Sequence, residues 1–346
     1  PSAGKAAQSP IYVLSTTSLY KLIGSQLTEQ KAVLYDSTLS KYGRFVAIDQ
    51  DNEGTLYLLE SNPDKTFNLY RQELNGSYTA LASHRTFSVG PDATTIVTSL
   101  ATPTPTRVYV AGTNVMRYNG SVWQNLNRPT GNDTPHLRVR AFSGTNTIVT
   151  IMGNTAYTYD GTVWGPLTLS PVMHPADIWG TSLDTLIVVG QTTEANPANR
   201  KGLALRRANN AWETVAGFTA INPKVVYGTS DGGLIVVGGA GGEILTASGS
   251  DYVFSANQNA PAAAVDLSFV AGGSSGIYCG GAGSLLAKSG SGFQALVPDS
   301  ALSLPANVVF QSGDCDATGR LYLTSDQGQI VVYDPTVTSW TSIAAA

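Results

Sequence analysis

The sharpest chemical pattern in the sequence is an acidic stretch that begins at Asp49. Acidic side chains stand at Asp49, Asp51 and Glu53, Gly54 follows, and a further acid stands at Glu60. Calcium loops of the EF-hand type have this spacing, with alternating oxygen ligands and then a glycine that makes the sharp turn. The flanking residues read as strands, so the same residues could instead build a tight turn. Asp49, Asp51 and Glu53 are the candidate calcium ligands, and the turn is the favoured alternative.

The same outline recurs near the end of the chain. Asp314 and Asp316 precede Gly319, and Ser325 stands where the last acid would be. Recurrence at one place in a repeat favours the turn, because Asp and Gly are ordinary turn residues.

A second cluster of chemically useful residues contains two of the three histidines. His136 and His174 are 38 residues apart and align at the start of two predicted strands. Arginine, acidic and aromatic residues follow in these strands and in the next one. The candidate ligand-binding residues are His136, Arg138, His174, Asp177, Trp179, Lys224 and Tyr227, with Arg140 nearby. Ring stacking and bidentate guanidinium contacts suit a sugar or a peptide carboxylate. The competing interpretations are a polar rim and ion pairs that line a wet channel.

Residues for catalysis do not converge in the sequence. There is no nucleophile elbow and no His-Glu-x-x-His motif, and histidine and cysteine are scarce. The glycine-rich stretch Val237–Gly242 lies between two predicted strands and does not open a helix, so it is not read as a phosphate loop. We predict that the chain is not an enzyme.

The elements that position these residues are predicted from a repeat of aromatic side chains. Aromatic residues recur at intervals of 45, 41, 48, 40, 41 and 47 residues, at Tyr78, Trp123, Trp164, Trp212, Tyr252, Phe293 and Trp340. Most follow a short polar turn such as Asp160-Gly161-Thr162, and β-branched runs precede each turn. A unit of four strands about every 40 residues predicts an all-β β-propeller.

The repeat predicts one domain over residues 1–346, with eight four-stranded blades favoured and seven as the alternative. The first blade is predicted to be incomplete and to lack its innermost strand. The recurrent aromatics are predicted to pack one blade on the next, and the competing interpretation makes them sugar-stacking pockets.

The composition limits the partners. Charged residues are 13% of the chain and the net charge is -4, so no basic surface for nucleic acid is expected. No apolar run is long enough to span a bilayer, and a surface of hydroxyls and amides suits an extracellular or cell-surface setting. Cys279 and Cys315 occupy different repeat positions, which favours free thiols over a disulfide.

Two segments carry a resemblance to a known class of protein. Asp177-Ile178-Trp179-Gly180 runs into Leu186–Gly190, and Gly238–Gly242 runs into Glu243-Ile244-Leu245. These segments resemble the degenerate blade repeats of secreted bacterial β-propellers. The resemblance implies the architecture and a binding role, and it implies no chemistry.

We therefore expect a secreted or cell-surface binding module that recognises a glycan or a surface protein through loops at one end of the propeller channel. The first alternative is a structural subunit of an extracellular assembly or appendage, which would self-associate. A second alternative is a propeller hydrolase or lyase.

Overall fold

A computed structural model gives the arrangement of the chain, which is built from β-strands. The structure describes residues 11–14, 18–23, 26–33, 35–36, 41–51, 53, 55–75, 77–87, 97–127, 136–142, 144–216, 218, 222–228, 233–238, 244–248, 253–256, 267–273, 276–282, 284–290, 292–302, 304, 308–315, 319–325 and 330–343.

The described strands form one sheet of three strands, seven sheets of four strands and one small pair. The first sheet contains β1 (Ile11–Leu14), β2 (Ser18–Ile23) and β3 (Gln26–Ala32), and the pair contains β4 (Tyr35–Asp36) and β5 (Lys41–Tyr42). The next two sheets are β6 (Arg44–Gln50), β7 (Leu56–Ser61), β8 (Phe67–Gln72) and β9 (Tyr78–Arg85), then β10 (Val97–Thr104), β11 (Arg107–Gly112), β12 (Val115–Tyr118) and β13 (Trp123–Asn125).

The middle sheets carry the residues of most interest. They are β14 (His136–Ala141), β15 (Ile148–Met152), β16 (Thr155–Tyr159) and β17 (Trp164–Leu167), then β18 (Met173–Trp179), β19 (Ile187–Thr192), β20 (Gly202–Ala208) and β21 (Ala211–Val215). The next sheet is β22 (Pro223–Gly228), β23 (Leu234–Gly238), β24 (Ile244–Ser248) and β25 (Val253–Ala256).

The last two sheets complete the described strands. They are β26 (Leu267–Gly273), β27 (Gly276–Gly281), β28 (Ser284–Ser289) and β29 (Gly292–Ala295), then β30 (Phe310–Cys315), β31 (Leu321–Ser325), β32 (Ile330–Asp334) and β33 (Ser339–Ile343). Three short 3₁₀ turns lie at η1 (Leu183–Thr185), η2 (Pro197–Asn199) and η3 (Ser300–Leu302).

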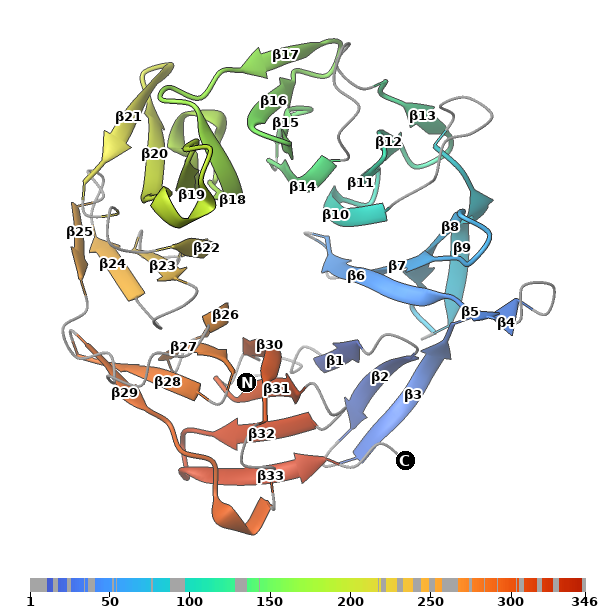
Figure 1. The fold of residues 1–346 in the computed structure, drawn as a ribbon. Helices are drawn as coiled ribbons and strands as arrows, with labels where there is room; N and C mark the ends of the chain where they lie inside the picture. The colour runs from blue at the N-terminus through green and yellow to red at the C-terminus, as the bar shows by residue number, and fades with distance from the viewer. Residues whose placement is uncertain are drawn as a thin grey trace, which may run out of the picture.

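Each sheet pairs its strands in chain order, and every pairing is antiparallel. The sheets follow one another around a centre, with the first strand of each sheet innermost (Figure 1). Contacts between neighbouring first strands, such as β10 with β14 and β18 with β22, agree with this view. The arrangement is a β-propeller, as the repeat predicts.

The sequence of each strand fits its distance from the centre. The second strand β15 reads Ile-Val-Thr-Ile-Met and is buried at every position, because neighbouring sheets cover both of its faces. The outer strand β21 reads Ala-Trp-Glu-Thr-Val and is mostly exposed. The turn before β17 is fixed by Asp160, whose Oδ1 accepts from the amides of Thr162 and Val163, and by Gly161 at φ 105°.

The outer aromatic side chains pack between sheets, and the predicted packing role is confirmed. Trp123 and Trp164 are partly buried against clusters of apolar residues from two neighbouring sheets. Their indole N–H groups donate to backbone oxygens of the preceding sheet's outer region, Trp123 to Leu81 at 2.8 Å and Trp164 to Leu126 at 2.8 Å. Tyr252 lies outside the described residues.

The prediction of eight four-stranded blades is wrong. The described residues form seven four-stranded sheets, not eight, and the sheet β1–β3 has three strands. The alternative of seven blades leaves β1–β3 without a place, although Figure 1 shows this sheet between β30–β33 and β6–β9. After β3 the described residues pair β4 with β5, and they add no fourth strand to the sheet β1–β3.

The first sheet is incomplete, as predicted, but not where predicted. Strand β1 contacts β6, the innermost strand of the following sheet, so β1 is itself an innermost strand. In the described part of this sheet, the position without a strand is therefore the outermost one. Neither Cys279, which is buried, nor Cys315, which is half-buried, forms a disulfide in this structure.

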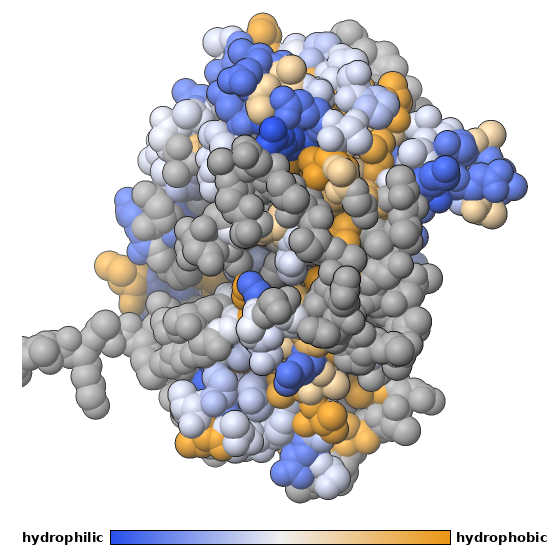
Figure 2. Space-filling view, turned by 90° about the vertical axis from the view of Figure 1, so that its left-hand side faces the viewer, coloured by the Kyte–Doolittle hydropathy of each residue, from blue (hydrophilic) through white to orange (hydrophobic). Residues whose placement is uncertain are grey.

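The side surface mixes residue types. Figure 2 shows apolar residues in small separate groups among hydrophilic ones on the described part of one side of the molecule. Single exposed valines such as Val122 and Val163, at equivalent turns of neighbouring sheets, fit this pattern. Among the described residues, no helix has the length and apolar character that crossing a bilayer requires.

Candidate functional site

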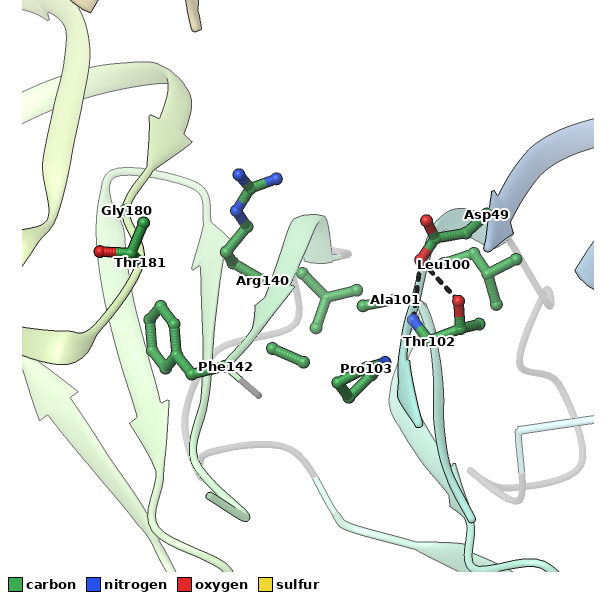
Figure 3. Close-up of a pocket in the computed structure, with 11 residues that line it drawn as sticks. Asp49, Leu100, Ala101, Thr102, Pro103, Arg140, Phe142, Gly180 and Thr181 are labelled. Carbon is green, nitrogen blue, oxygen red and sulfur yellow. Dashed lines mark hydrogen bonds between the residues drawn. The ribbon is translucent and has the colours of Figure 1, made fainter. Parts of the chain in front are cut away.

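Two adjoining cavities lie along the innermost strands of five successive sheets, from β6 to β22. Each has a volume of about 390 Å³, and both are lined by Leu100, Val139 and Arg140. The first cavity, shown in Figure 3, is also lined by Asp49, Ala101, Thr102, Pro103, Ala141, Phe142, Gly180 and Thr181. The second is also lined by Ser99, Arg138, Asp177, Ile178, Trp179, Val226, Tyr227 and Gly228.

A β-bulge sets which side chains reach the cavities. Strand β14 has an irregular register between His136 and Arg138, and β18 has the same irregularity between Pro175 and Asp177. Side chains alternate along a strand, so residues two apart lie on one face. Arg138 and Arg140 therefore lie on the same face of β14 and reach the same open region.

The bulge also makes residues of different sheets comparable. The first residue after the bulge is Ser99 in β10, Arg138 in β14, Asp177 in β18 and Val225 in β22. Two residues further on stand Ala101, Arg140, Trp179 and Tyr227. We call this second set the ring positions, and in β6 the ring position is Asp49.

Asp177 ties β18 to β22. Its Oδ2 accepts from the amide of Val226 at 3.2 Å, and its Oδ1 accepts from the amide of Ile178 at 2.9 Å. The Arg138 Nε lies 3.6 Å from Oδ1, and the side chains are 54% exposed for Arg138 and 16% for Asp177. Burial raises the pKa of Asp177, while the Val226 amide and the Arg138 charge act in the opposite direction.

Similar ties join other innermost strands. Ser99 Oγ in β10 accepts from the amide of Val139 at 3.2 Å, and Asp177 makes the equivalent bond two sheets later. Asp49 Oδ2 accepts from the amide of Thr102 at 2.7 Å and from its hydroxyl at 2.9 Å, as the dashed lines in Figure 3 show. These polar side chains line the cavities and also satisfy backbone donors of the next sheet.

Aromatic rings close the far side of the second cavity. A Cβ on Gly228 would lie only 2.0 Å from the Trp179 ring, and a Cβ on Gly272 would lie 2.7 Å from the Tyr227 hydroxyl oxygen. Each ring thus rests against a glycine of the following sheet, and only glycine fits beneath it. Trp179 and Tyr227 are both half-buried and form an aromatic wall.

Arg140 stands between the two cavities. Its side chain is exposed and extends into the open region between Thr181 and Asp49 (Figure 3). Within the described part of the chain, its guanidinium makes neither a hydrogen bond nor an ion pair, and its charge contributes to lowering the pKa of Asp177. A guanidinium in this state is suited to a carboxylate or another anion.

The structure brings four of the seven predicted ligand-binding residues together, because Arg138, Asp177, Trp179 and Tyr227 all line the second cavity. The other three are elsewhere. Lys224 is exposed at the bulge of β22 and lines neither cavity, and His174 lies near the start of β18 with its Nδ1 2.8 Å from Asn154 Oδ1. The backbone of His136 begins β14, and its side chain is outside the described set. A ligand role for these residues stays a prediction.

Sequence reasoning missed the side of the site that β10 and the end of β18 contribute. Ser99, Leu100, Thr102 and Thr181 line the cavities. An alignment of the innermost strands on the bulge would have shown that Ser99 in β10 is equivalent to Asp177 in β18. The residue types of Leu100, Thr102 and Thr181 do not by themselves indicate a binding role.

The acidic stretch at Asp49 is folded as a turn. Asp51 Oδ1 accepts from the amides of Glu53 and Thr55, each at 2.9 Å, and Tyr57 donates its hydroxyl to Oδ2 at 3.0 Å. Burial and the Asp51 charge raise the pKa of Tyr57. Glu53 is exposed. The donors already present on Asp51 favour the turn interpretation.

The remaining acids of the pattern lie apart from this turn. Glu60 is fully buried in β7, where its Oε2 accepts from Asn68 Nδ2 at 2.9 Å and from the Tyr70 hydroxyl at 2.8 Å. The Asp314 side chain lies outside the described set. Among described residues, no three His, Cys, Asp or Glu side chains gather as a metal site. Calcium binding stays a prediction.

The comparisons with known proteins identify the fold. No protein-family model matches the chain, and no curated protein matches it. Among solved structures, the chain is similar to YCF48 bound to D1 peptide, at 12% identity over 96% of each chain with a TM-score of 0.58. It is also similar to the dihydro-heme d1 dehydrogenase NirN in complex with DHE, at 11% identity over 99% of this chain and 74% of that one, with a TM-score of 0.68.

A third similar structure is a catalytically inactive virginiamycin B lyase from Staphylococcus aureus with quinupristin. It is 14% identical over 86% of this chain and 96% of that one, with a TM-score of 0.56. At such identities the likeness shows the β-propeller fold alone. The fold accommodates catalysis as well as binding, because a lyase and a dehydrogenase stand among these structures.

Proposed function

We propose that this chain is a binding protein whose ligand is a segment of another polypeptide with a negatively charged group. The two adjoining cavities form the site, and the charged group pairs with Arg140. The carrying observation is the exposed guanidinium of Arg140 between the two cavities, with neither a hydrogen bond nor an ion pair to any described residue. A charge-assisted bond of this type contributes about 1.5–3 kcal/mol.

The shape of the site supports an extended ligand. The cavities lie side by side along strands from five sheets, so a chain that crosses them passes Arg140 and two differently lined hollows. An extended polypeptide can place different side chains in two neighbouring hollows. The solved structure of YCF48 has a bound D1 peptide, which is consistent with peptide recognition by a propeller of this shape.

A glycan is the second candidate, and the aromatic wall favours it. Trp179 and Tyr227 present ring surfaces to the second cavity, and sugars stack on such rings. The site for a neutral glycan would not need Arg140. This difference separates the two candidates by experiment.

A role without catalysis is also part of the proposal. Among the described residues that line the two cavities there is no histidine or cysteine, and the Asp49 and Asp177 carboxylates already accept backbone hydrogen bonds. A general base must direct its proton-accepting atom at the substrate, whereas these two carboxylates accept hydrogen bonds from the next sheet.

We place the protein outside the cell or at its surface on the basis of its low content of charged residues.

A library of random peptides tests the function. Peptides selected on the wild-type protein are expected to be enriched in Asp and Glu and to bind Arg140→Gln at least about tenfold more weakly. Lys288→Gln is the matched control, because it removes the same charge from an exposed position on β28. Equal binding to all three proteins would refute the proposal. Strong signals on a glycan array that Arg140→Gln does not change would favour the sugar candidate.

A further inference from the structure

We infer that the first cavity is a specificity pocket for a planar apolar group placed next to the ligand's carboxylate. The inference rests on the proposed function and adds the chemical class of the ligand. Aryl carboxylates, or an aromatic side chain beside a carboxylate, fit this description.

The lining of the first cavity is divided by polarity. Buried apolar side chains form its floor: Leu100, Ala101, Val139 and Phe142, with Ala141 half-buried beside them. Polar groups stand at its rim, with Arg140 and Thr181 on one side and Asp49 and Thr102 on the other (Figure 3). A ligand that fits both parts has an apolar body and a charged edge.

The repeat itself indicates a flat group. At the ring positions of β18 and β22, Trp179 and Tyr227 place their rings against the following sheet. The equivalent residue of β14 is Arg140, which supplies no ring. At β18 and β22 an aromatic side chain fills the space next to the following sheet. At β14 the equivalent space is part of the first cavity. A ring supplied by the ligand would complete the series.

The charges orient the ligand. Asp49 faces the cavity from the side opposite Arg140 (Figure 3). Its Oδ2 is held by the amide and hydroxyl of Thr102, so the carboxylate keeps its position. A ligand carboxylate is attracted by Arg140 and repelled by Asp49, and it therefore lies at the Arg140 side. An uncharged edge or an N–H donor suits the Asp49 side.

The volume agrees with one such group. The cavity measures about 390 Å³, near the lower end of the range of roughly 300–1,000 Å³ for small-molecule pockets. It holds a single ring with its substituents. The second cavity is then left for the remainder of the ligand.

Matched small ligands test the inference by calorimetry on the intact chain. N-acetyl-L-phenylalanine is expected to bind, and its amide, which has the same ring without the charge, is expected to bind about ten- to a hundredfold more weakly. Acetate, which has the charge without the ring, is expected to show no binding at millimolar concentration.

Two variants locate the binding. Thr181→Trp places a large side chain at the exposed rim of the first cavity and is expected to abolish binding of N-acetyl-L-phenylalanine. Thr193→Trp makes the same change at an exposed position of the β19–β20 connection, away from both cavities, and is expected to leave binding unchanged. Far-ultraviolet circular dichroism shows whether both variants are folded.

The outcomes separate this inference from the proposed function. Absence of binding by N-acetyl-L-phenylalanine, equal binding of acid and amide, or unchanged binding to a folded Thr181→Trp variant each overturns the specificity pocket. If selected acidic peptides still depend on Arg140 in those cases, the proposed function stands. If they do not depend on Arg140, the proposed function fails as well.

Discussion

The contact between Trp179 and Gly228 gives the most direct test of how the site is built. A Cβ at position 228 would lie 2.0, 2.2 and 2.4 Å from three atoms of the Trp179 ring. Carbon atoms in contact lie about 3.5–4.0 Å apart, so in Gly228→Ala the ring must move by about 1.5 Å. Overpacking of this size costs about 1–3 kcal/mol in the free energy of unfolding.

A double-mutant cycle assigns that cost to the ring. In a Trp179→Ala background the obstructing ring is absent, so Gly228→Ala is expected to change the free energy of unfolding by no more than about 1 kcal/mol. The coupling energy between the two substitutions is then about 1–3 kcal/mol. Urea unfolding followed by circular dichroism measures all four proteins, and an unchanged denaturant slope keeps them comparable.

A glycine with open space provides the control. A Cβ on Gly165 in β17 would lie 3.9 Å from its nearest neighbour, Thr158 Cγ2, which is ordinary contact. Gly165→Ala is expected to change the free energy of unfolding by no more than about 1 kcal/mol. If Gly228→Ala costs the same with and without Trp179, the ring does not rest on Gly228. If Gly165→Ala is as costly as Gly228→Ala, the effect is general to strand glycines. Either result refutes the reasoning.

Three further predictions concern the frame around the site. Trp123→Phe removes the indole bond to the Leu81 oxygen and is expected to lower the free energy of unfolding by about 1–3 kcal/mol; Trp212→Phe, measured by the same urea assay, is the control for ring size. Asp51→Ala removes the acceptor of three hydrogen bonds and is expected to lower the melting temperature. Added calcium or EDTA is expected to leave the melting temperature of the wild type unchanged. A calcium-induced rise in the wild type that the variant loses would instead support a calcium site. Hydrogen bonds from backbone and side-chain donors lower the pKa of Asp160 from 3.8 to about 2. The Asp160 charge therefore stabilises the fold above pH 3.8, and this stabilisation is lost as the pH falls through about 2. The difference in melting temperature between the wild type and Asp160→Asn is expected to shrink over that interval, and a constant difference would contradict this explanation.

The repeat of aromatic residues was sufficient to predict the propeller. Trp123 and Trp164 each follow a turn in which Asn119 or Asp160 accepts from the next amides, and this local chemistry is visible in the sequence. The first sheet was not predicted correctly. Its described residues lack an outer strand and pair β4 with β5 instead, and the sequences of these two short segments do not indicate that pairing.

The candidate site was predicted in part for a physical reason. Arg138 and Asp177 are charged residues next to the aliphatic residues Val139 and Ile178, and a charged side chain within a predicted strand indicates a candidate binding position. His174 has a polar side chain too, but it lies near the start of β18 and lines neither cavity. Sequence spacing does not show how far along the strand a cavity opens, because the bulge and the packing of the next sheet determine that position.

The acidic pattern at Asp51 fits both a calcium loop and a turn, and residue types alone do not distinguish the two. Asp51 has the right spacing for a metal ligand, yet its two oxygens accept three hydrogen bonds from the chain itself. The residue that distinguishes the two interpretations is Tyr57, whose hydroxyl reaches back to Asp51 from the following strand. Only the folded register of β6 with β7 brings those two residues together.

The site lies where the repeat is broken, and this has a consequence for specificity. Between β18 and β22 the ring position carries Trp179, and between β22 and β26 it carries Tyr227; both rings rest against the next sheet. Between β6 and β10 it carries Asp49, which bonds Thr102. Between β14 and β18 it carries Arg140, and the first cavity is open there. The packing between sheets depends on the outer aromatics, so the ring position of β14 can change without disturbing them, and ligand preference is expected to follow the residue at that one position.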